Sequence, residues 1–283
     1  MPGRNCPPDD AYVAAVGHDP IKLTIPTYEF TADIRVSSDP KLAIEAITEA
    51  ARGLLGDDDR KRIAERTTRL TAASSAYVAS IEAEAKSQSG SDPISPIWVS
   101  YQIGQLVDDN TIILDETLPT PRAREFMPNA RPGSYFANPG SSGGWSPGAA
   151  LGAKLAAPDK DVIAVTGDGF YMFGTPAPAL WAAAHHGAPY MIVVFTNRSY
   201  TTGTSRIAAT YGEEGFAKKA GFPGGYFDPP IDFAKEAEAA GAYGETVTDP
   251  AEVGPALRRG LEQTRAGKPA VISVWLQRLE ADD

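Results

Sequence analysis

The stretch that decides the fold runs from Val162 to Tyr200 and reads VIAVTGDGFYMFGTPAPALWAAAHHGAPYMIVVFTNRSY. It begins with the apolar run Val162–Thr166 and ends just after the apolar run Met191–Phe195, and the Ala-rich stretch Pro176–His186 lies between them. Short runs that are apolar throughout are typical of strands buried on both faces, and a helix between two such strands connects a parallel pair. The stretch therefore predicts one strand–helix–strand unit of a parallel sheet.

The same alternation continues on both sides of this unit. Further apolar runs, each a predicted strand, are Thr111–Leu114, Gly244–Val247 and Val271–Trp275. Further predicted helices cover Ser146–Ala157, Ile231–Ala240 and Ala251–Arg265. Strands that alternate with helices fold into a parallel sheet with helices on both faces. Residues 94–283 are therefore predicted to form one α/β domain built on a doubly wound parallel sheet.

Residues 1–37 are predicted to form an arm. Prolines and aspartates crowd residues 1–20, which we interpret as an ordered arm at best. Residues 22–37 contain enough β-branched and aromatic residues for one short strand. Pro26 cannot donate a hydrogen bond to a neighbouring strand, so it favours a place at a sheet edge.

Residues 38–93 are predicted to be a helical segment that ends in a linker. Asp39 and Pro40 suit the N-cap and the first position of a helix. A second helical stretch, rich in Ala and charged residues, covers residues 60–88, and Ser87–Pro93 (SQSGSDP) is typical of a linker. The arm and this segment together are too small and too helical for a core of their own.

The composition excludes several classes of protein. Of the 283 residues, 42% are hydrophobic, which is enough for a core, and the formal net charge is −10. An acidic chain without a basic block argues against nucleic-acid binding and against attachment to an anionic membrane. Cys6 is the single cysteine, so an internal disulfide cannot form. No stretch approaches the ~20 apolar residues of a membrane span, and Met1–Asp10 lacks the apolar core of a secretory signal, so we expect a cytoplasmic protein.

Glycines and polar residues follow both strands of the central unit. Gly167-Asp168-Gly169 comes directly after the first strand, and Asn197 and Ser199 follow the second. Because ligands bind at the carboxyl ends of parallel strands, these residues are expected to face one site. A carboxylate, an amide oxygen and a main-chain carbonyl suit Mg²⁺, which takes its other ligands from water and a diphosphate. Taken alone, the GDG sequence or the Asn after a strand is more typical of a turn or a cap. Their occurrence together in one strand–helix–strand unit predicts a magnesium–diphosphate site.

The central unit also resembles the thiamine-diphosphate motif, in which GDG is followed some two dozen residues later by a paired Asn. Here 26 residues lie between Gly169 and Thr196. The stretches LAAPDKDVIAVTGDG, PPIDFAKEAEAAGAYGETV and GKPAVISV are similar to the pyrophosphate-binding domain of the acetolactate synthase and benzoylformate decarboxylase group. IPTYEFTADIRVSSDPKLAIEAI resembles the end of the central domain of that group, so the resemblance covers nearly the whole chain.

The resemblance implies thiamine diphosphate and Mg²⁺ as cofactors. The Asp168 and Asn197 side chains and the Ser199 carbonyl would ligate Mg²⁺, and the Gly169 and Phe170 N–H groups would face the diphosphate. The whole cofactor-binding set that the resemblance implies is Thr117, Leu118, Ser141, Ser142, Gly143, Gly144, Gly167, Asp168, Gly169, Phe170, Asn197, Ser199, Tyr200 and Thr201.

Two loops outside the central unit complete this set. Thr117 and Leu118 would lie near the diphosphate end of the cofactor. Ser141 and Ser142, in the glycine-rich run Gly140–Trp145, would offer a main-chain carbonyl to the aminopyrimidine amine. By residue type alone, such a run before a helix is either a phosphate cradle or a helix cap.

The sequence departs from the family pattern at several positions. Thr196 replaces the first Asn of the pair, and Phe170 replaces the Ser that usually follows GDG. Gly143 stands where the family has a large aliphatic residue under the bent cofactor, which suggests extra room there. The segment Gly174–Pro178 is about two residues longer than in the decarboxylases. These departures leave the substrate open.

The resemblance also implies a glutamate that this chain does not supply. In the family it comes from a pyrimidine-binding domain that precedes the central domain, whereas Met1 falls within the last part of the central domain. We therefore expect no catalytic residue here, but one subunit of a split enzyme, a heterotetramer with a second subunit that carries the pyrimidine domain. The apolar strand near Ile25–Ile34 would complete a sheet in that partner.

The expected holoenzyme is a lyase (decarboxylase) or carboligase for a small-molecule 2-oxo acid or 2-hydroxyacyl compound, CoA thioesters included. An alternative is a non-catalytic, degenerate scaffold subunit, which Phe170, Thr196 and Gly143 favour and which Asp168 and Asn197 oppose. A nicotinamide dehydrogenase is disfavoured because G-x-G-x-x-G does not follow a first strand. The stretch after the magnesium loop, residues 201–227, has no clear period and is either a lid or partner contact or an ordinary surface excursion.

Overall fold

The computed structural model describes residues 7–8, 10–21, 32–117, 123–127, 130–140, 143–212 and 214–278. The chain divides into two compact units, Met1–Ala73 and Ser74–Asp283. The boundary falls within the second predicted helical stretch.

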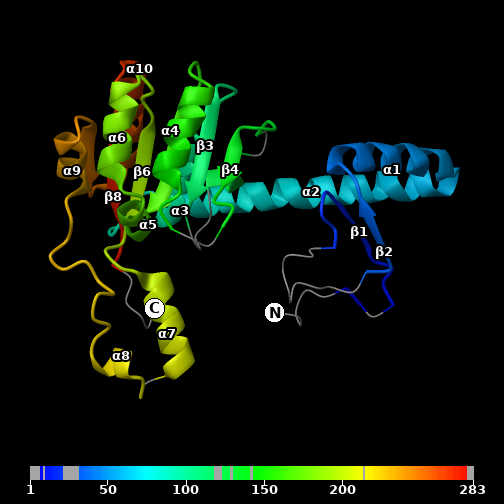
Figure 1. Cartoon of the computed structure of the whole chain (residues 1–283), viewed down its shortest axis with the longest axis horizontal. Helices are drawn as coiled ribbons and strands as arrows, with labels where there is room; N and C mark the ends of the chain where they lie inside the picture. The colour runs from blue at the N-terminus through cyan, green and yellow to red at the C-terminus, as the bar shows by residue number, and fades with distance from the viewer. Residues whose placement is uncertain are drawn as a thin grey trace. The chain divides into compact units, whose positions relative to one another are not determined.

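The larger unit is built on a six-stranded sheet (Figure 1). The strand order is β4-β3-β5-β6-β8-β7, and every neighbouring pair is parallel. The strands are β3 (Thr111–Glu116), β4 (Tyr135–Ala137), β5 (Asp161–Gly167), β6 (Met191–Thr196), β7 (Tyr243–Val247) and β8 (Ala270–Trp275).

Helices cover both faces of this sheet. Side chains along each strand point alternately to either side, so each face carries apolar side chains that a layer of helices buries. One core, beneath α3 and α10, includes Ile163, Val193 and Leu257. The other, beneath α4, α6 and α9, includes Ala164 and Ile192. The helices are α3 (Pro96–Gly104), η1 (Ala123–Phe126), α4 (Ser146–Ala156), α5 (Asp168–Phe173), α6 (Pro176–His185), α7 (Thr201–Tyr211), α8 (Phe216–Lys219), α9 (Phe233–Ala239), η2 (Pro250–Glu252) and α10 (Val253–Arg265). The doubly wound parallel sheet is thus confirmed.

The sequence did not predict every element. The edge strand β4 is three residues long and pairs only with β3, so it is too short to show an alternation. Helix α5 begins at Asp168 itself, where the glycines favour a turn, and α7 is built from Thr, Gly and Ser, which are weak helix formers.

The smaller unit contains the parallel pair β1 (Ala14–Gly17) and β2 (Ile34–Ser37), helix α1 (Pro40–Leu54) and the first part of α2 (Asp57–Ser87). As predicted, Asp39 caps α1, since its Oδ1 accepts hydrogen bonds from the N–H groups of Lys41 (2.8 Å) and Leu42 (3.3 Å).

Strand β1 lies within residues 1–20, where no strand was predicted; its sequence, AAVG, carries little β signal. The strand expected within residues 22–37 is present as β2 in its last part, whereas residues 22–31, with Pro26, lie outside the described residues.

None of the described residues of the smaller unit is buried. Instead α1 exposes Leu42, Ile44, Ile47 and Leu54, each by 60% or more. Within the described ranges, no helix combines the length and the apolar character that a membrane span requires.

Candidate cofactor site at the carboxyl edge of the sheet

The predicted site residues follow three neighbouring strands of the larger unit. Thr117 comes after β3, Asp168 after β5 and Asn197 after β6. The strands are in register, with Glu116 beside Thr166 and Gly167 beside Phe195. The structure therefore brings these residues to one edge of the sheet, where α5 lies in Figure 1.

The Asp168 carboxylate is held by main-chain donors. Asp168 is only 2% exposed, so its carboxylate is buried. Its Oδ1 accepts the Gly169 N–H at 2.8 Å, and its Oδ2 accepts the Arg198 N–H. Burial raises the pKa of Asp168 to about 7, although these N–H donors act in the opposite direction. A cation beside this carboxylate would lower the pKa and offset the cost of burying its charge.

The loop after β6 is folded against the 225–227 segment. Asn197 Oδ1 accepts the Ser199 N–H at 3.0 Å, and Thr201 donates its hydroxyl to Ser199 Oγ at 2.9 Å. The Tyr200 N–H donates to the Gly225 carbonyl at 2.8 Å. Ser199 is 4% exposed. Hydrogen bonds within the loop and to the 225–227 segment therefore hold this loop in place.

These residues fit the chemistry of a magnesium–diphosphate site. They offer one carboxylate and one amide oxygen, together with main-chain carbonyls. Among the described residues there is no cluster of three or more His, Cys, Asp or Glu side chains that could hold a metal. Mg²⁺ suits such a sparse oxygen set, because it keeps several waters and binds phosphate oxygens.

Glycines let the loops at this edge approach one another closely. A Cβ on Gly169 would lie 2.7 Å from the Tyr200 ring. Gly144 has φ +94°, and a Cβ there would lie 2.6 Å from the Gly174 nitrogen. A side chain at Gly144 would therefore force the glycine-rich loop away from the segment that follows α5.

Two departures from the family pattern meet in space. A Cβ on Gly143 would lie 2.4 Å from Cδ1 of the Phe170 ring. The room that Gly143 suggested in the sequence is thus taken by the Phe170 side chain, which is a correction. The third departure, Thr196, is buried and its hydroxyl lies 2.8 Å from Ser273 Oγ, so it joins β6 to β8.

Two buried acids at the end of β3 were missed by sequence reasoning. Glu116 accepts hydrogen bonds from the N–H groups of Trp145 and Ser146, both at 2.9 Å, where α4 begins, and from Asn138 Nδ2 at 2.7 Å. It therefore anchors the glycine-rich loop at a helix N-terminus, where a negative charge is favourable.

The other acid, Asp115, fixes Thr117. Its Oδ1 accepts the Thr117 N–H at 2.8 Å and hydroxyl at 2.6 Å, and its Oδ2 accepts the Tyr135 hydroxyl at 2.6 Å. The signal that could have revealed both residues is an acidic pair that ends an otherwise apolar strand.

The remaining predicted residues fall into two groups. Tyr200 packs edge-on against Phe227 (4.8 Å between ring centroids) and near Phe173 (5.8 Å), and Thr201 begins α7. Leu118, Ser141 and Ser142 lie outside the described residues.

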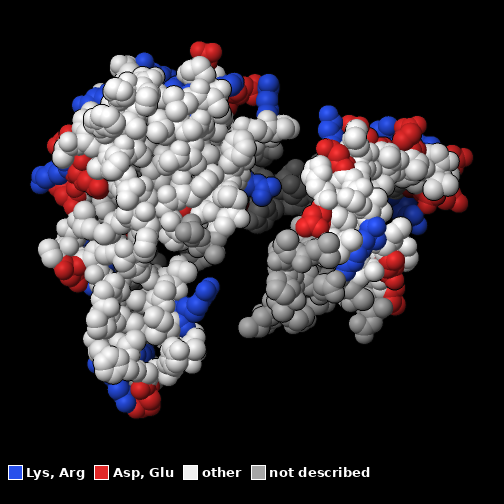
Figure 2. Space-filling model, viewed as in Figure 1, with Lys and Arg blue, Asp and Glu red and all other residues white. Residues whose placement is uncertain are grey.

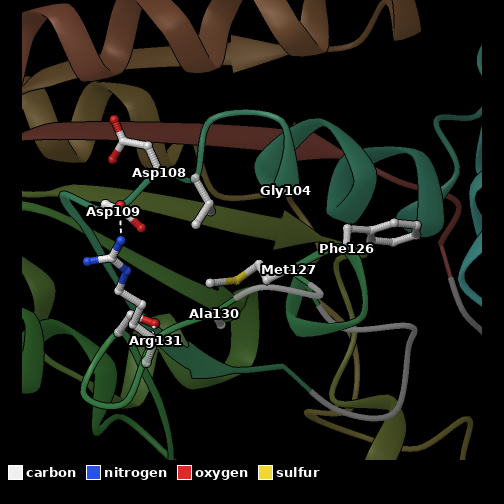
Figure 3. Close-up of a pocket in the computed structure, with 9 residues that line it drawn as sticks. Gly104, Asp108, Asp109, Phe126, Met127, Ala130 and Arg131 are labelled. Carbon is white, nitrogen blue, oxygen red and sulfur yellow. Dashed lines mark hydrogen bonds and ion pairs between the residues drawn. The ribbon is translucent and has the colours of Figure 1, made fainter. Parts of the chain in front are cut away.

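A cavity of about 180 Å³ lies at the other end of β3, before the strand begins (Figure 3). In Figure 3 Arg131 points toward Asp109, with which it forms an exposed ion pair of 2.5 Å. The cavity is lined by Gly104, Val107, Asp108, Asp109, Phe126, Met127, Ala130, Arg131 and Ser134. None of these is a predicted cofactor residue, so this cavity is separate from the candidate site.

Comparison with known proteins agrees with the geometry of the site. The family model "Thiamine pyrophosphate enzyme, C-terminal TPP binding domain" matches residues 120–274. Sulfoacetaldehyde acetyltransferase of Alcaligenes xylosoxydans xylosoxydans is 32% identical over 159 residues, which are 55% of this chain and 24% of that protein. Benzoylformate decarboxylase of Pseudomonas aeruginosa is 30% identical over 189 residues, which are 66% of this chain and 33% of that protein.

A solved structure gives the same result. The thiamine diphosphate-dependent 4-hydroxybenzoylformate decarboxylase of Rhodococcus jostii RHA1 matches with a TM-score of 0.54 and 29% identity, over 67% of this chain and 34% of that chain. This chain thus spans between 24% and 34% of the length of these relatives. Since the family model matches more than half of the chain, the protein belongs to the thiamine pyrophosphate enzymes and contains their C-terminal TPP-binding domain.

Proposed function

We propose that this chain is the cofactor-binding subunit of a split thiamine-diphosphate-dependent lyase or carboligase. The observation that carries the proposal is the buried Asp168 carboxylate beside Asn197, at the adjoining ends of β5 and β6. In the proposed enzyme these two side chains and the Ser199 carbonyl hold Mg²⁺, which binds the diphosphate. A partner chain supplies the pyrimidine-binding domain and the catalytic glutamate.

The cofactor supplies a nucleophilic carbon and an electron sink for cleaving a bond next to a carbonyl. The residues of this chain bind and orient it. Phe170 would present its main-chain N–H at the start of α5, whereas the Gly169 N–H already donates to Asp168 Oδ1 at 2.8 Å and would orient the metal carboxylate. Glu116 and Asp115 hold the glycine-rich loop and Thr117 in place.

The hydrogen bonds of the buried acids at the end of β3 support the proposal that the partner chain supplies the catalytic glutamate. Asp115 and Glu116 are the acids at the end of β3, and each already accepts three hydrogen bonds. A carboxylate that satisfies the start of a helix or a neighbouring loop cannot leave it without cost. Neither residue is therefore a good candidate for the acid that contacts the aminopyrimidine.

The smaller unit supports the need for a partner. Two parallel strands alone bury neither face, and such sheets are stable only when more strands and helices cover them. Val16, Ile34 and Val36 on this pair are 36%, 44% and 39% exposed. The proposed complex is a heterotetramer of this chain and its partner. In it, the partner packs on these two strands and on α1.

The larger unit also exposes apolar surface. Figure 2 shows that the face over α4 and α6 carries few charged side chains. Helices α4, α5 and α6 expose Leu155 (53%), Phe173 (66%) and Trp181 (61%). Large apolar side chains exposed on a face with few charges favour a protein–protein contact there.

The substrate class is a 2-oxo acid or a 2-hydroxyacyl compound, including a CoA thioester. The names of the relatives support the first, since benzoylformate is a 2-oxo acid. The family assignment removes the nicotinamide dehydrogenase alternative.

Binding calorimetry with thiamine diphosphate and Mg²⁺ tests the cofactor site. Asp168→Asn should weaken cofactor binding by about 100-fold or more, because loss of a residue that merely supports a ligand already costs 10- to 100-fold. Asp161→Asn is the matched control, since Asp161 is a buried carboxylate at the opposite end of β5, paired with Arg265.

The proposal predicts wild-type cofactor affinity for the control. Equal binding by Asp168→Asn and the wild type would refute the site. If the wild-type chain bound no cofactor, alone or with its partner, the scaffold alternative would be favoured.

A further inference from the structure

Arg198 occupies an unusual place between two proposed magnesium ligands, Asn197 and Ser199. Its backbone is left-handed, with φ +60°. This conformation is disfavoured for residues that carry a Cβ and is usually taken by glycine. In it, the Arg198 N–H donates to Asp168 Oδ2, and the Arg198 carbonyl accepts the Phe227 N–H at 3.0 Å. One backbone position therefore joins the metal carboxylate to the 225–227 segment.

The side chain of Arg198 is anchored on the exit of strand β8. Its guanidinium carbon lies 5.1 Å from the centre of the Trp275 ring, and its terminal nitrogen donates to the Leu276 carbonyl at 3.0 Å. The anchor is itself fixed to β6, because Trp275 pairs with Thr196 and the Leu276 N–H donates to the Thr196 carbonyl at 3.0 Å. The contacts thus close a ring from β6 through Arg198 to β8 and back.

We propose that Arg198 is a positioning residue for the divalent cation. Its stacking on Trp275 and its bond to Leu276 hold the left-handed backbone, which in turn aims an N–H at Asp168 and sets Asn197 and Ser199 on the same side of the turn. The inference rests on the proposed function, because it presupposes a cation between Asp168 and Asn197.

The test uses Mn²⁺ as the probe, with the full chain and thiamine diphosphate, and measures free Mn²⁺ by electron paramagnetic resonance. Arg198→Ala should weaken Mn²⁺ binding about tenfold, because a partly buried cation–π contact and a charged hydrogen bond are lost. Arg198→Lys should recover part of the affinity, since an ammonium keeps the charge but cannot both stack and donate as a planar guanidinium does.

Arg198→Gly separates the anchor from the backbone strain. Glycine adopts the left-handed conformation freely but leaves the loop untied. We expect it to weaken Mn²⁺ binding several-fold while the melting temperature of the metal-free protein changes little. Trp275→Leu should add little to the effect of Arg198→Ala, because the two side chains act through one contact.

Arg265→Ala is the matched control. Arg265 pairs with buried Asp161 at the opposite end of the sheet, so its loss should lower the melting temperature and leave Mn²⁺ affinity unchanged. Wild-type affinity in both Arg198→Ala and Arg198→Gly would overturn the positioning role, provided that Asp168→Asn abolishes binding. Wild-type affinity in Asp168→Asn would instead refute the proposed function.

Discussion

The contact between Gly143 and Phe170 gives a sharp test of the packing at the candidate site. In Gly143→Ala the new Cβ would lie 2.4 Å from Cδ1, 2.9 Å from Cε1 and 3.3 Å from Cγ of the Phe170 ring. Three overlaps on one ring cannot be relieved without rotating the ring or moving the loop. Overpacking of this kind costs about 1–3 kcal/mol. We expect Gly143→Ala to lower the free energy of unfolding by that amount.

A double-mutant cycle in urea isolates the contact. In the Phe170→Ala background the ring is absent, so Gly143→Ala should cost less than about 0.5 kcal/mol, which leaves a coupling of about 1–3 kcal/mol. Gly152→Ala is the matched control, because nothing lies within 4 Å of a Cβ there and it is in the interior of α4. It should stabilise the protein by up to about 1 kcal/mol. The reasoning is refuted if the cost of Gly143→Ala is the same with and without the Phe170 ring.

Three further predictions follow from buried charges and exposed apolar residues. In EDTA, the free energy of unfolding should fall as the pH rises from about 4 to about 7, because folded Asp168 keeps a proton that the unfolded chain releases. Urea titrations at several pH values measure this dependence, and the free energy of unfolding of Asp168→Asn should change less with pH. Glu116→Gln replaces a charged acceptor of three hydrogen bonds and should cost about 1–3 kcal/mol in the same assay, and a wild-type value would contradict its anchoring role. Ile47→Glu, at a position that is 60% exposed, should leave the melting temperature of the isolated chain unchanged but abolish co-purification of the partner, whereas retained co-purification would exclude α1 from the interface.

The sequence predicted the parts of the fold whose signal is local. The strands β5, β6 and β8 are continuous apolar runs, and Asp39-Pro40 is a helix start that needs no tertiary information. Strand β4 was missed because its three residues are defined by pairing with β3, which brings Ile113 beside Tyr135. Strand β1 was missed for the same reason, since Ala14–Gly17 is a strand only beside β2.

The candidate site was predicted unevenly. The spacing between GDG and Asn197 placed Asp168 and Asn197 at one edge of the sheet, because parallel strands end together. The supporting contacts could not be predicted, since they join residues far apart in the sequence: Arg198 reaches the Leu276 carbonyl 78 residues away, and Glu116 reaches Ser146 30 residues away. The fit of the Phe170 ring against Gly143 likewise depends on side-chain directions that the sequence does not reveal.

The central claim is that this chain binds thiamine diphosphate as one subunit of a split enzyme. Native mass spectrometry of the tagged chain, purified from its own host with Mg²⁺ and thiamine diphosphate present, tests it most directly. We predict a stoichiometric second chain and bound cofactor in the same complex. A homo-oligomer that holds the cofactor without a second chain would contradict the account, because this chain would then supply the pyrimidine-side contacts itself.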